Sequence, residues 1–283
     1  MTFLEKGQEA DGSFISYSSA SMRPFRRVRS WQTTFVPALM LGALAAVDQP
    51  HAWGIREKLA KFLLRQKDVN GSFNYWAKGA AEYTAQSYPN DLDDTFCALA
   101  GLHAHNPKIV DEAVLVQAIK LLVAAEAAVG GPYRTWLVSP DSEPVWLDID
   151  IAVNSNIAYF LSLVGSRLPA LDEAMGEAIA GGVFSSPYYP SPYIFPYYFA
   201  RAYEGPKRAE LLDRTRRLHE TAATDLDRAL CLCARLRLGE TQDVSGKAEE
   251  LMAGQRRNGG WAARLCTPIP LRTASSITMA VRL

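Results

Sequence analysis

The sequence predicts an all-α protein built as an α/α toroid barrel, a six-hairpin ring in which inner and outer helices alternate. Three observations predict this fold. Apolar residues recur at helical spacing along most of the chain, no sustained alternation of apolar and polar residues marks a sheet, and successive helices differ in character. We therefore expect about six helix pairs, one of them incomplete, closed into a single domain over residues 1–283.

Apolar periodicity and breaker clusters such as "DQPH" and "LGETQD" set the helix boundaries. The predicted helices cover residues 32–48, 52–66, 92–105, 109–128, 150–164, 168–181, 191–204, 207–221, 224–238, 243–255 and 272–282. A helix that is apolar all round belongs inside a protein, and an amphipathic helix belongs on the outside. The inner set is 32–48, 92–105, 150–164, 191–204 and 272–282, and the outer set is 52–66, 168–181, 207–221 and 243–255. In a ring the inner helices run the same way, so the loops that lead into them gather at one mouth.

Composition limits the classes of function. The chain has 283 residues, a formal net charge of zero and 48% hydrophobic residues, as an ordinary globular protein has. The balanced charge argues against a nucleic-acid-binding protein, since such proteins carry a basic excess. The four cysteines lack the spacing of a disulfide framework or a zinc site, which favours reduced thiols.

Targeting signals are not evident in the sequence. The N-terminal stretch has no basic region followed by an apolar run, so we expect no signal peptide. The longest apolar stretch, "TTFVPALMLGALAAV", has about 15 residues and is too short to span a bilayer, so no integral membrane segment is expected. These features predict a cytoplasmic protein.

A short motif occurs three times along the chain. Each copy has a glutamine, three or four residues, a glycine, one residue and an aromatic side chain. The copies are Gln8, Gly12 and Phe14; Gln66, Gly71 and Phe73; and Gln255, Gly259 and Trp261. The glutamine can bond free backbone groups at a helix end, the glycine permits the turn, and the aromatic ring packs over the junction. One copy is an ordinary helix C-cap, but three copies indicate an internal repeat.

The stretch "NDLDDTF", residues 90–96, places three carboxylates directly before an apolar segment. Two interpretations are open. In the first, Asn90 or Asp91 is a helix N-cap, and Asp93 and Asp94 lie in the first turn, where aspartate is common. In the second, one of these acids is kept protonated for use as a general acid.

Together the repeats and the acidic motif resemble those of the terpene-cyclase and protein-prenyltransferase superfamily. The repeats resemble the QW motifs of squalene–hopene and oxidosqualene cyclases, and "DLDDT" matches the D-x-D-D motif of class II terpene cyclases. The resemblance implies an α/α barrel that cyclises a linear isoprenoid, with a prenyl diphosphate as one candidate substrate. It also implies that Asp93 protonates an alkene while Asp91 and Asp94 orient it.

The chain differs from members of this superfamily in two ways. Protein prenyltransferases bind zinc through Asp, Cys and His, and "DLDRALCLC" lacks that arrangement. Most class II cyclases have two barrels, whereas this chain has the length of one. The shorter form leaves open a homodimer or a partner domain that completes the site, or a loss of activity.

Alkene protonation requires a carboxylic acid that is neutral and shielded from water. A helix N-terminus stabilises a carboxylate by about 0.3–1 kcal/mol, less than one pKa unit. Burial and neighbouring like charge raise a carboxyl pKa by up to about 3–5 units. Asp93 is therefore expected to act as the acid if its loop is dry, and the cluster titrates as a coupled set.

Further site candidates come from the loops predicted at the mouth. Aromatic faces stabilise carbocations, although the same residues are also typical of core packing. The predicted substrate-binding residues are Trp31, Phe35, Trp76, Phe96, Trp136, Trp146, Tyr193 and Phe195, with Arg27 and Arg134 for an anionic group. The alternative for the basic loop that contains Arg27 is a solvated loop or a contact with a membrane surface.

The segment "VWLDIDIAVNSNIAYF" carries polar side chains at the start of a predicted inner helix. Asp148, Asp150 and Asn154 are weak candidates for Mg²⁺, which a diphosphate substrate would bring. A hydrogen-bonded network that also includes Asn156 and braces the loop is the alternative. Two other functions stay open: a non-catalytic isoprenoid-binding or scaffold subunit, and an α/α-barrel enzyme acting on glycans.

Overall fold

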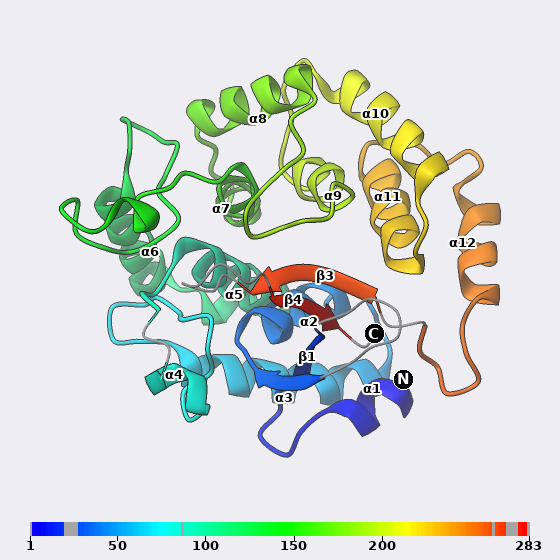
Figure 1. The fold of residues 1–283 in the computed structure, drawn as a ribbon, viewed down its shortest axis with the longest axis horizontal. Helices are drawn as coiled ribbons and strands as arrows, with labels where there is room; N and C mark the ends of the chain where they lie inside the picture. The colour runs from blue at the N-terminus through cyan, green and yellow to red at the C-terminus, as the bar shows by residue number, and fades with distance from the viewer. Residues whose placement is uncertain (1, 20–27, 86–87, 262–263, 270–276, 282–283) are drawn as a thin grey trace. The chain divides into compact units, whose positions relative to one another are not determined.

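The computed structural model describes residues 2–19, 28–85, 88–261, 264–269 and 277–281, and it is mostly helical (Figure 1). Its α-helices are α1 Thr2–Gly7, α2 Phe35–Leu44, α3 Pro50–Gln66, α4 Ala81–Ala85, α5 Leu92–His105, α6 Glu112–Ala125, α7 Ile151–Leu163, α8 Pro169–Gly181, α9 Ile194–Ala200, α10 Arg208–Thr221, α11 Asp225–Arg237 and α12 Val244–Ala253. Two 3-10 helices, η1 Pro107–Ile109 and η2 Pro144–Trp146, lie in the loops. The predicted helices are confirmed with one exception, and α5 begins and ends where the sequence predicts.

The all-α prediction is wrong in one respect, because the structure contains a four-stranded sheet with the strand order β2-β1-β4-β3. Its strands are β1 Ile15–Ser19, β2 Arg29–Gln32, β3 Arg264–Ile269 and β4 Ile277–Val281. The β4 strand pairs antiparallel with both β1 and β3. The helix predicted at 272–282 is therefore wrong over residues 277–281, and its remainder lies outside the described residues. "ITMAV" is rich in β-branched side chains, which favour a strand over a helix.

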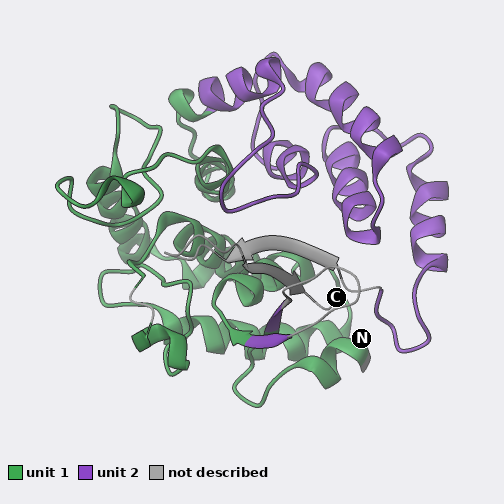
Figure 2. Cartoon of the chain, viewed as in Figure 1, with its two compact units in different colours: residues 1–15, 31–171 green, residues 16–30, 172–283 purple. Residues whose placement is uncertain are grey.

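The chain divides into two compact units (Figure 2). Unit 1 comprises residues 1–15 and 31–171, and unit 2 comprises residues 16–30 and 172–283. The candidate acids belong to unit 1. The expectation of one domain over the whole chain stays a prediction.

The core of unit 1 is built around α5, which packs against α2, α3 and α7. Every residue from Leu92 to Leu102 is buried, as expected for a helix that is apolar on nearly all sides. The contact between α2 and α5 is close because Gly42 and Gly101 meet there. A Cβ at Gly101 would lie 2.8 Å from the carbonyl oxygen of Ala38, so the crossing excludes a side chain. This close packing fixes α5, and therefore the acids at its N-terminus.

Unit 2 shows the same alternation between buried and exposed helices. In α9 the aromatic residues Phe195 and Phe199 are fully buried and pack against each other with ring centroids 6.1 Å apart. In α10 only Leu211 and Thr215 are buried, so most of that helix faces solvent. Within the described ranges, no helix combines the length and apolar character needed to cross a membrane.

Candidate acid site

The three repeats form the same turn in the structure. Gly12, Gly71 and Gly259 all have a φ of about +91°, a left-handed conformation that side chains disfavour. In each copy, the side chain of the residue before the glycine accepts a hydrogen bond from the backbone N–H of the residue after the glycine. The predicted helix-ending turn is confirmed at all three positions. "EAAVGGPY", residues 126–133, forms a similar glycine turn that the motif does not include, because glutamate replaces the glutamine.

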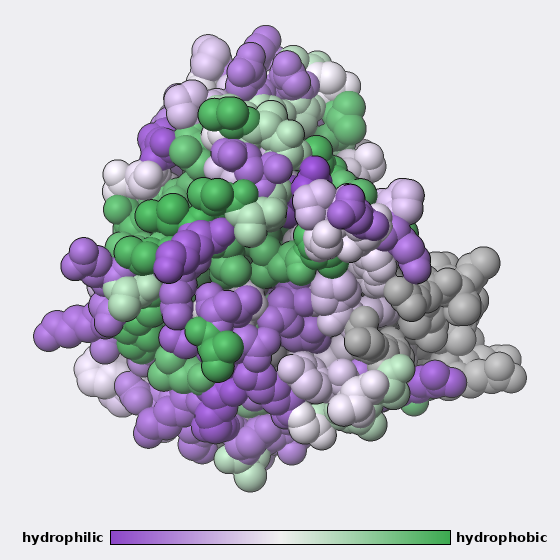
Figure 3. Space-filling view, turned by 90° about the vertical axis from the view of Figure 1, so that its left-hand side faces the viewer, coloured by the Kyte–Doolittle hydropathy of each residue, from purple (hydrophilic) through white to green (hydrophobic). Residues whose placement is uncertain are grey.

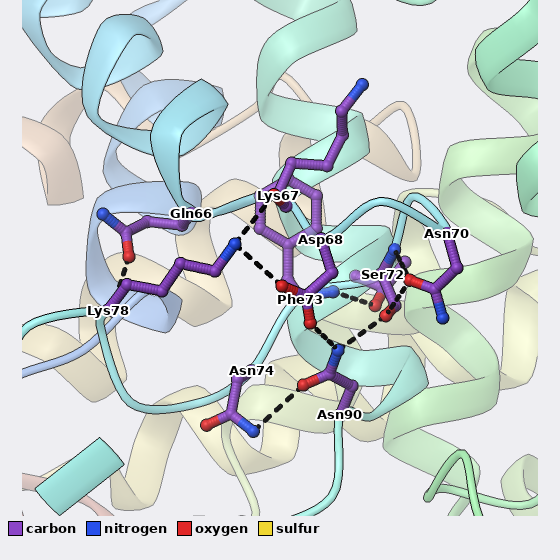
Figure 4. A network of polar contacts seen from close by, with 10 residues as sticks. Gln66, Lys67, Asp68, Asn70, Ser72, Phe73, Asn74, Lys78 and Asn90 are labelled. Carbon is purple, nitrogen blue, oxygen red and sulfur yellow. Dashed lines mark hydrogen bonds and ion pairs between the residues drawn. The ribbon is translucent and has the colours of Figure 1, made fainter. Parts of the chain in front are cut away.

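The second turn braces the residue that precedes the acids (Figure 4). Asn90 donates from Nδ2 to Asp68 Oδ2 at 2.5 Å and to Ser72 Oγ at 2.7 Å. Lys78 Nζ forms an ion pair with Asp68 Oδ1 at 2.7 Å and also donates to the carbonyl of Lys67. Burial raises the pKa of Asp68, but the hydrogen bonds from Lys78 and Asn90 lower it below the usual value. The turn therefore presents a carboxylate that holds Asn90 in place.

Backbone contacts fix the strand of chain that enters α5. The N–H of Asp91 donates to the carbonyl of Phe73 at 3.3 Å, and the N–H of Leu92 donates to the carbonyl of Thr135 at 2.8 Å. The Asp91 carboxylate then accepts from the N–H of Asp94 at 2.7 Å, which caps the helix. The capping interpretation of the motif is confirmed for Asp91.

All three acids are buried, which the capping interpretation alone does not require. Asp91 and Asp94 are each 3% exposed, whereas Asp93 is 9% exposed. Asp93 Oδ1 accepts from Nδ2 of Asn156 on α7 at 2.6 Å and lies 3.9 Å from Sγ of Cys97. Of the three acids, Asp93 is the one with the largest accessible surface.

Burial changes the charge state of the cluster. It raises the pKa of Asp91 well above the usual value, and the charges of Asp94 and Asp93 add to this. Burial also raises the pKa of Asp94 to about 7, against hydrogen bonds from Asp91 and Thr34 that lower it. Near neutral pH the cluster therefore keeps at least one proton, as expected for acids shielded from water.

Aromatic side chains gather next to the acids within unit 1. Trp76 lies 5.4 Å from Trp31 and 6.0 Å from Tyr88, measured between ring centroids. Tyr88 in turn lies 6.0 Å from Trp136, which packs edge-on against Trp146 at 4.9 Å. The backbone of Trp136 pairs with that of Asp91, which places one end of this cluster beside the acids. Four of the predicted aromatic residues are thus brought together, and Tyr88 joins them without having been predicted.

Three more of the predicted binding residues, Phe35, Phe96 and Arg134, also belong to unit 1. Phe96 is fully buried and packs against Phe160 with centroids 5.3 Å apart, as a core residue does. Phe35 is 6% exposed at the start of α2, and Arg134 is half-buried in the loop before η2. Arg27 lies outside the described residues.

Tyr193 and Phe195 belong to unit 2. The Tyr193 hydroxyl donates to the carbonyl of Thr221 at 3.0 Å. Phe195 stacks on Phe184 with ring centroids 6.0 Å apart and is fully buried. Both side chains thus have structural contacts within their own unit, and a substrate-binding role for them stays a prediction.

Two of the three candidate magnesium ligands, Asp150 and Asn154, are engaged with the backbone. Asp150 caps α7 by accepting from the N–H groups of Ala152 and Val153 at 2.8 and 3.2 Å. Asn154 accepts from the N–H of Tyr133 at 2.8 Å and donates to its carbonyl at 2.9 Å. These contacts favour the bracing network at Asp150 and Asn154. Asp148 Oδ2 accepts from Oγ1 of Thr135 at 2.9 Å. A magnesium site at these three residues stays a prediction. In the described part of the chain, no three His, Cys, Asp or Glu side chains group as metal ligands.

Two residues that contact the acids had no separate role in the sequence prediction. Asn156 bonds Asp93, and Thr34 donates from Oγ1 to Asp94 Oδ1 at 3.2 Å. The signal for Asn156 is the polar "NSN" within an otherwise apolar buried helix, where polar side chains need partners. Thr34 carries no such signal, because a threonine before a helix is common.

Comparison with solved structures defines the class of fold. No protein-family model matches the sequence, and neither does any curated protein. A crystal structure of a protein from Actinoplanes is 18% identical, with a TM-score of 0.68 over 93% of this chain and 80% of that chain. The chain has a terpene cyclase-like fold, because the second structure is the type II terpene cyclase MstE from Scytonema. That structure, solved with its substrate geranylgeranyl dihydroxybenzoate, is 16% identical, with a TM-score of 0.66 over 95% of this chain and 80% of that chain.

Proposed function

We propose that this protein is a class II terpene cyclase, which starts the cyclisation of a linear isoprenoid by protonating an alkene with Asp93. The observation that carries the proposal is a cluster of three buried aspartates at the start of a core helix, beside a group of aromatic rings. Buried carboxyl groups that hold a proton at neutral pH are suited to acid catalysis, and the likeness in fold to a type II terpene cyclase supports the same chemistry.

The contacts around the acids give each of them a role. Asp93 has the largest accessible surface, so it is the acid that meets the substrate. Its Oδ1 accepts from Asn156, so the proton that it transfers is carried on Oδ2. Asp91 and Asp94 share a proton, so together they carry one negative charge next to Asp93 instead of two.

The chemical step balances as a proton transfer. The O–H bond of Asp93 breaks while a C–H bond forms at one alkene carbon, and the other alkene carbon becomes a carbocation. The Asn156 amide donates to the carboxylate that remains. Aromatic faces such as those of Trp76, Tyr88 and Trp136 stabilise the cation through their quadrupoles. A C–H bond of the final cation then breaks, which forms a new C=C bond and releases a proton to solvent. Asp93 takes up a proton from solvent, and the acid is restored.

The remaining expectations belong to the same proposal. The chain would be an α/α toroid barrel that acts as one cyclase domain. The substrate would be a linear isoprenoid, either a prenyl diphosphate or a hydrocarbon such as squalene. A diphosphate would be accompanied by Mg²⁺, which neutralises phosphate charge.

The test is to incubate the purified protein with prenyl diphosphates of several lengths and with squalene, and to identify extracted products by mass spectrometry. We expect a cyclic product from the native protein. The Asp93→Asn variant should form none above background, because asparagine keeps the shape of aspartate and has no carboxyl proton.

Thermal melting of both proteins controls for folding. The proposal is supported if Asp93→Asn melts at the same temperature as the native protein but has lost turnover. Full turnover by Asp93→Asn would exclude Asp93 as the acid. If the native protein binds isoprenoids but forms no product from any of them, the non-catalytic binding alternative replaces the cyclase.

A further inference from the structure

One face of α6 is apolar although it is exposed to solvent. Val116, Ile119 and Val123 follow one another at helical spacing and are 45%, 57% and 67% exposed. Val69, in the neighbouring turn, is fully exposed, and its carbonyl accepts from Gln117 of α6 at 3.3 Å. We call Val69, Val116, Ile119 and Val123 the α6 face. Figure 3, which views the molecule from this side, shows apolar residues next to one another at the height at which α6 lies in Figure 1.

Another solvent-facing helix of the same unit has a different surface. On α3 the exposed apolar residues Trp53 and Leu64 are separated by the exposed charged side chains Glu57, Lys58 and Lys61. Single exposed apolar residues of this kind are normal on a protein surface. A continuous apolar stripe is unusual and marks an interaction site.

The two charged residues of α6 lie at equal distances from Val116 along the helix. Glu112 lies four residues before Val116 and Lys120 lies four residues after it, and both side chains are exposed. Ala113 and Ile119 lie three residues to either side of the same position. No ion pair forms from Glu112 or Lys120 within the described ranges, so both charges are open to a partner.

This pattern is complementary to itself. Consider two α6 helices that pack antiparallel about a two-fold axis at Val116. A residue that precedes Val116 by a given number of positions in one helix then lies opposite the residue that follows Val116 by the same number in the other. For four positions, this meeting point is about 6 Å along the helix from the two-fold axis. Glu112 of each copy then lies opposite Lys120 of the other, and small Ala113 lies opposite large Ile119. A parallel arrangement would instead place Lys120 beside Lys120, where like charges repel.

We propose that the α6 face is the interface of a homodimer, in which α6 packs antiparallel against α6 of a second copy of this chain. The proposal is independent of the cyclase function. The apolar stripe supplies the buried surface, and the two Glu112–Lys120 pairs select the orientation.

Sedimentation of the purified 283-residue protein over a range of concentrations tests the proposal. We expect a monomer–dimer equilibrium that Val116→Glu weakens at least tenfold, because two carboxylates would meet at the axis. Glu112→Lys and Lys120→Glu should each weaken the dimer several-fold. An equimolar mixture of these two variants should recover it, because each lysine at 112 then faces a glutamate at 120. The double variant carrying both changes should also dimerise like the native chain.

Leu64→Glu on α3 is the matched control, since it places a carboxylate on an exposed apolar position outside the α6 face and should leave the equilibrium unchanged. Native thermal melting of each variant establishes that the surface changes leave the fold intact. A native chain that stays monomeric throughout would overturn the proposal, as would a mixture that fails to associate. Val116-dependent binding of the monomer to phosphatidylcholine vesicles would assign the α6 face to a membrane instead.

Discussion

Two helices of the chain begin with the same three residues, Asp-Leu-Asp, but the surroundings of these residues differ. α5 starts with "NDLDDTF" and α11 with "TDLDRAL". At α5 the three acids are buried, whereas at α11 the corresponding Asp225 and Asp227 are half-buried. Asp225 lies 3.5 Å from the guanidinium of Arg228, the residue that replaces the third acid. Asp227 accepts a hydrogen bond from the hydroxyl of Thr224, the N-cap of that helix.

The difference shows that the D-x-D spacing does not by itself make an acid site. At α11 an arginine and a capping threonine satisfy the carboxylates near solvent, as in any helix start. At α5 the three acids are buried at the start of a core helix, where Asp94 accepts from Thr34 and Asp93 accepts from Asn156 of α7. Burial, and not the D-x-D-D sequence by itself, raises the pKa of Asp91 and Asp94.

The largest expected effect is a loss of turnover when Asp93 at the start of α5 is replaced by asparagine. The same substitution of Asp227 at the start of α11 is the comparison. Under the proposed function, Asp93→Asn should lower turnover by about 10²–10⁴-fold, the usual contribution of a general acid. Asp227→Asn should leave turnover within about twofold, because Asp227 has a structural role only. Product formation by both variants is measured under identical conditions. An equal loss in the two variants would show that the α5 acids have no special role.

The charge state of the α5 cluster predicts a pH dependence of stability. The pKa of Asp94 is about 7 in the folded protein and near 3.8 in a solvated carboxyl. Between these values the folded state keeps a proton that the unfolded state has released, so the free energy of unfolding falls as pH rises from about 4 to about 7. The slope from this group is at most about 1.4 kcal/mol per pH unit.

The Asp94→Asn variant should lose that part of the pH dependence. Urea unfolding of the native protein and the variant at pH 5, 6, 7 and 8 gives the difference in free energy of unfolding at each pH. We expect the native protein to lose stability relative to the variant between pH 5 and pH 7, with little change above. A difference that stays constant across this range would mean that Asp94 is not protonated in the folded state.

Asn156 should have an intermediate effect, since it acts through Asp93. Removing its hydrogen bond with Asn156→Ala should lower kcat by about tenfold to a hundredfold, as expected for a hydrogen bond to a charged group. KM should stay unchanged, because the interaction stabilises the carboxylate left after proton transfer. A raised KM with native kcat would instead place Asn156 in substrate binding. Asn156→Ser, which keeps a donor, is expected to lose less.

The smallest expected effect is at α11. Thr224 caps that helix by accepting from the N–H of Asp227 at 3.1 Å. Thr224→Ala should reduce the free energy of unfolding by about 1 kcal/mol and leave turnover unchanged. Thr224→Ser, which keeps the cap, should restore most of the stability. Loss of turnover in Thr224→Ala without a change in melting would contradict a purely structural role for this helix start.

Sequence reasoning predicted the helices and the turns because their signals are local. The start of α5 has a capping aspartate followed by an apolar run, and the glycine turns are set by one residue type. The strand at 277–281 was missed because a short apolar run fits either a helix or a strand until its pairing partner is known. The contact between Asp93 and Asn156 was missed for a related reason, since it depends on how α5 packs against α7.

The acids and the turn that braces them belong to one continuous segment of the chain, residues 66–96. Contacts between residues so near in sequence close only short loops, so they form early when the chain folds. Asn156 reaches Asp93 from 63 positions further along. During synthesis the whole acidic turn therefore leaves the ribosome before the amide that bonds Asp93 has been made, so Asp93 acquires this partner later than Asp94 can acquire Thr34.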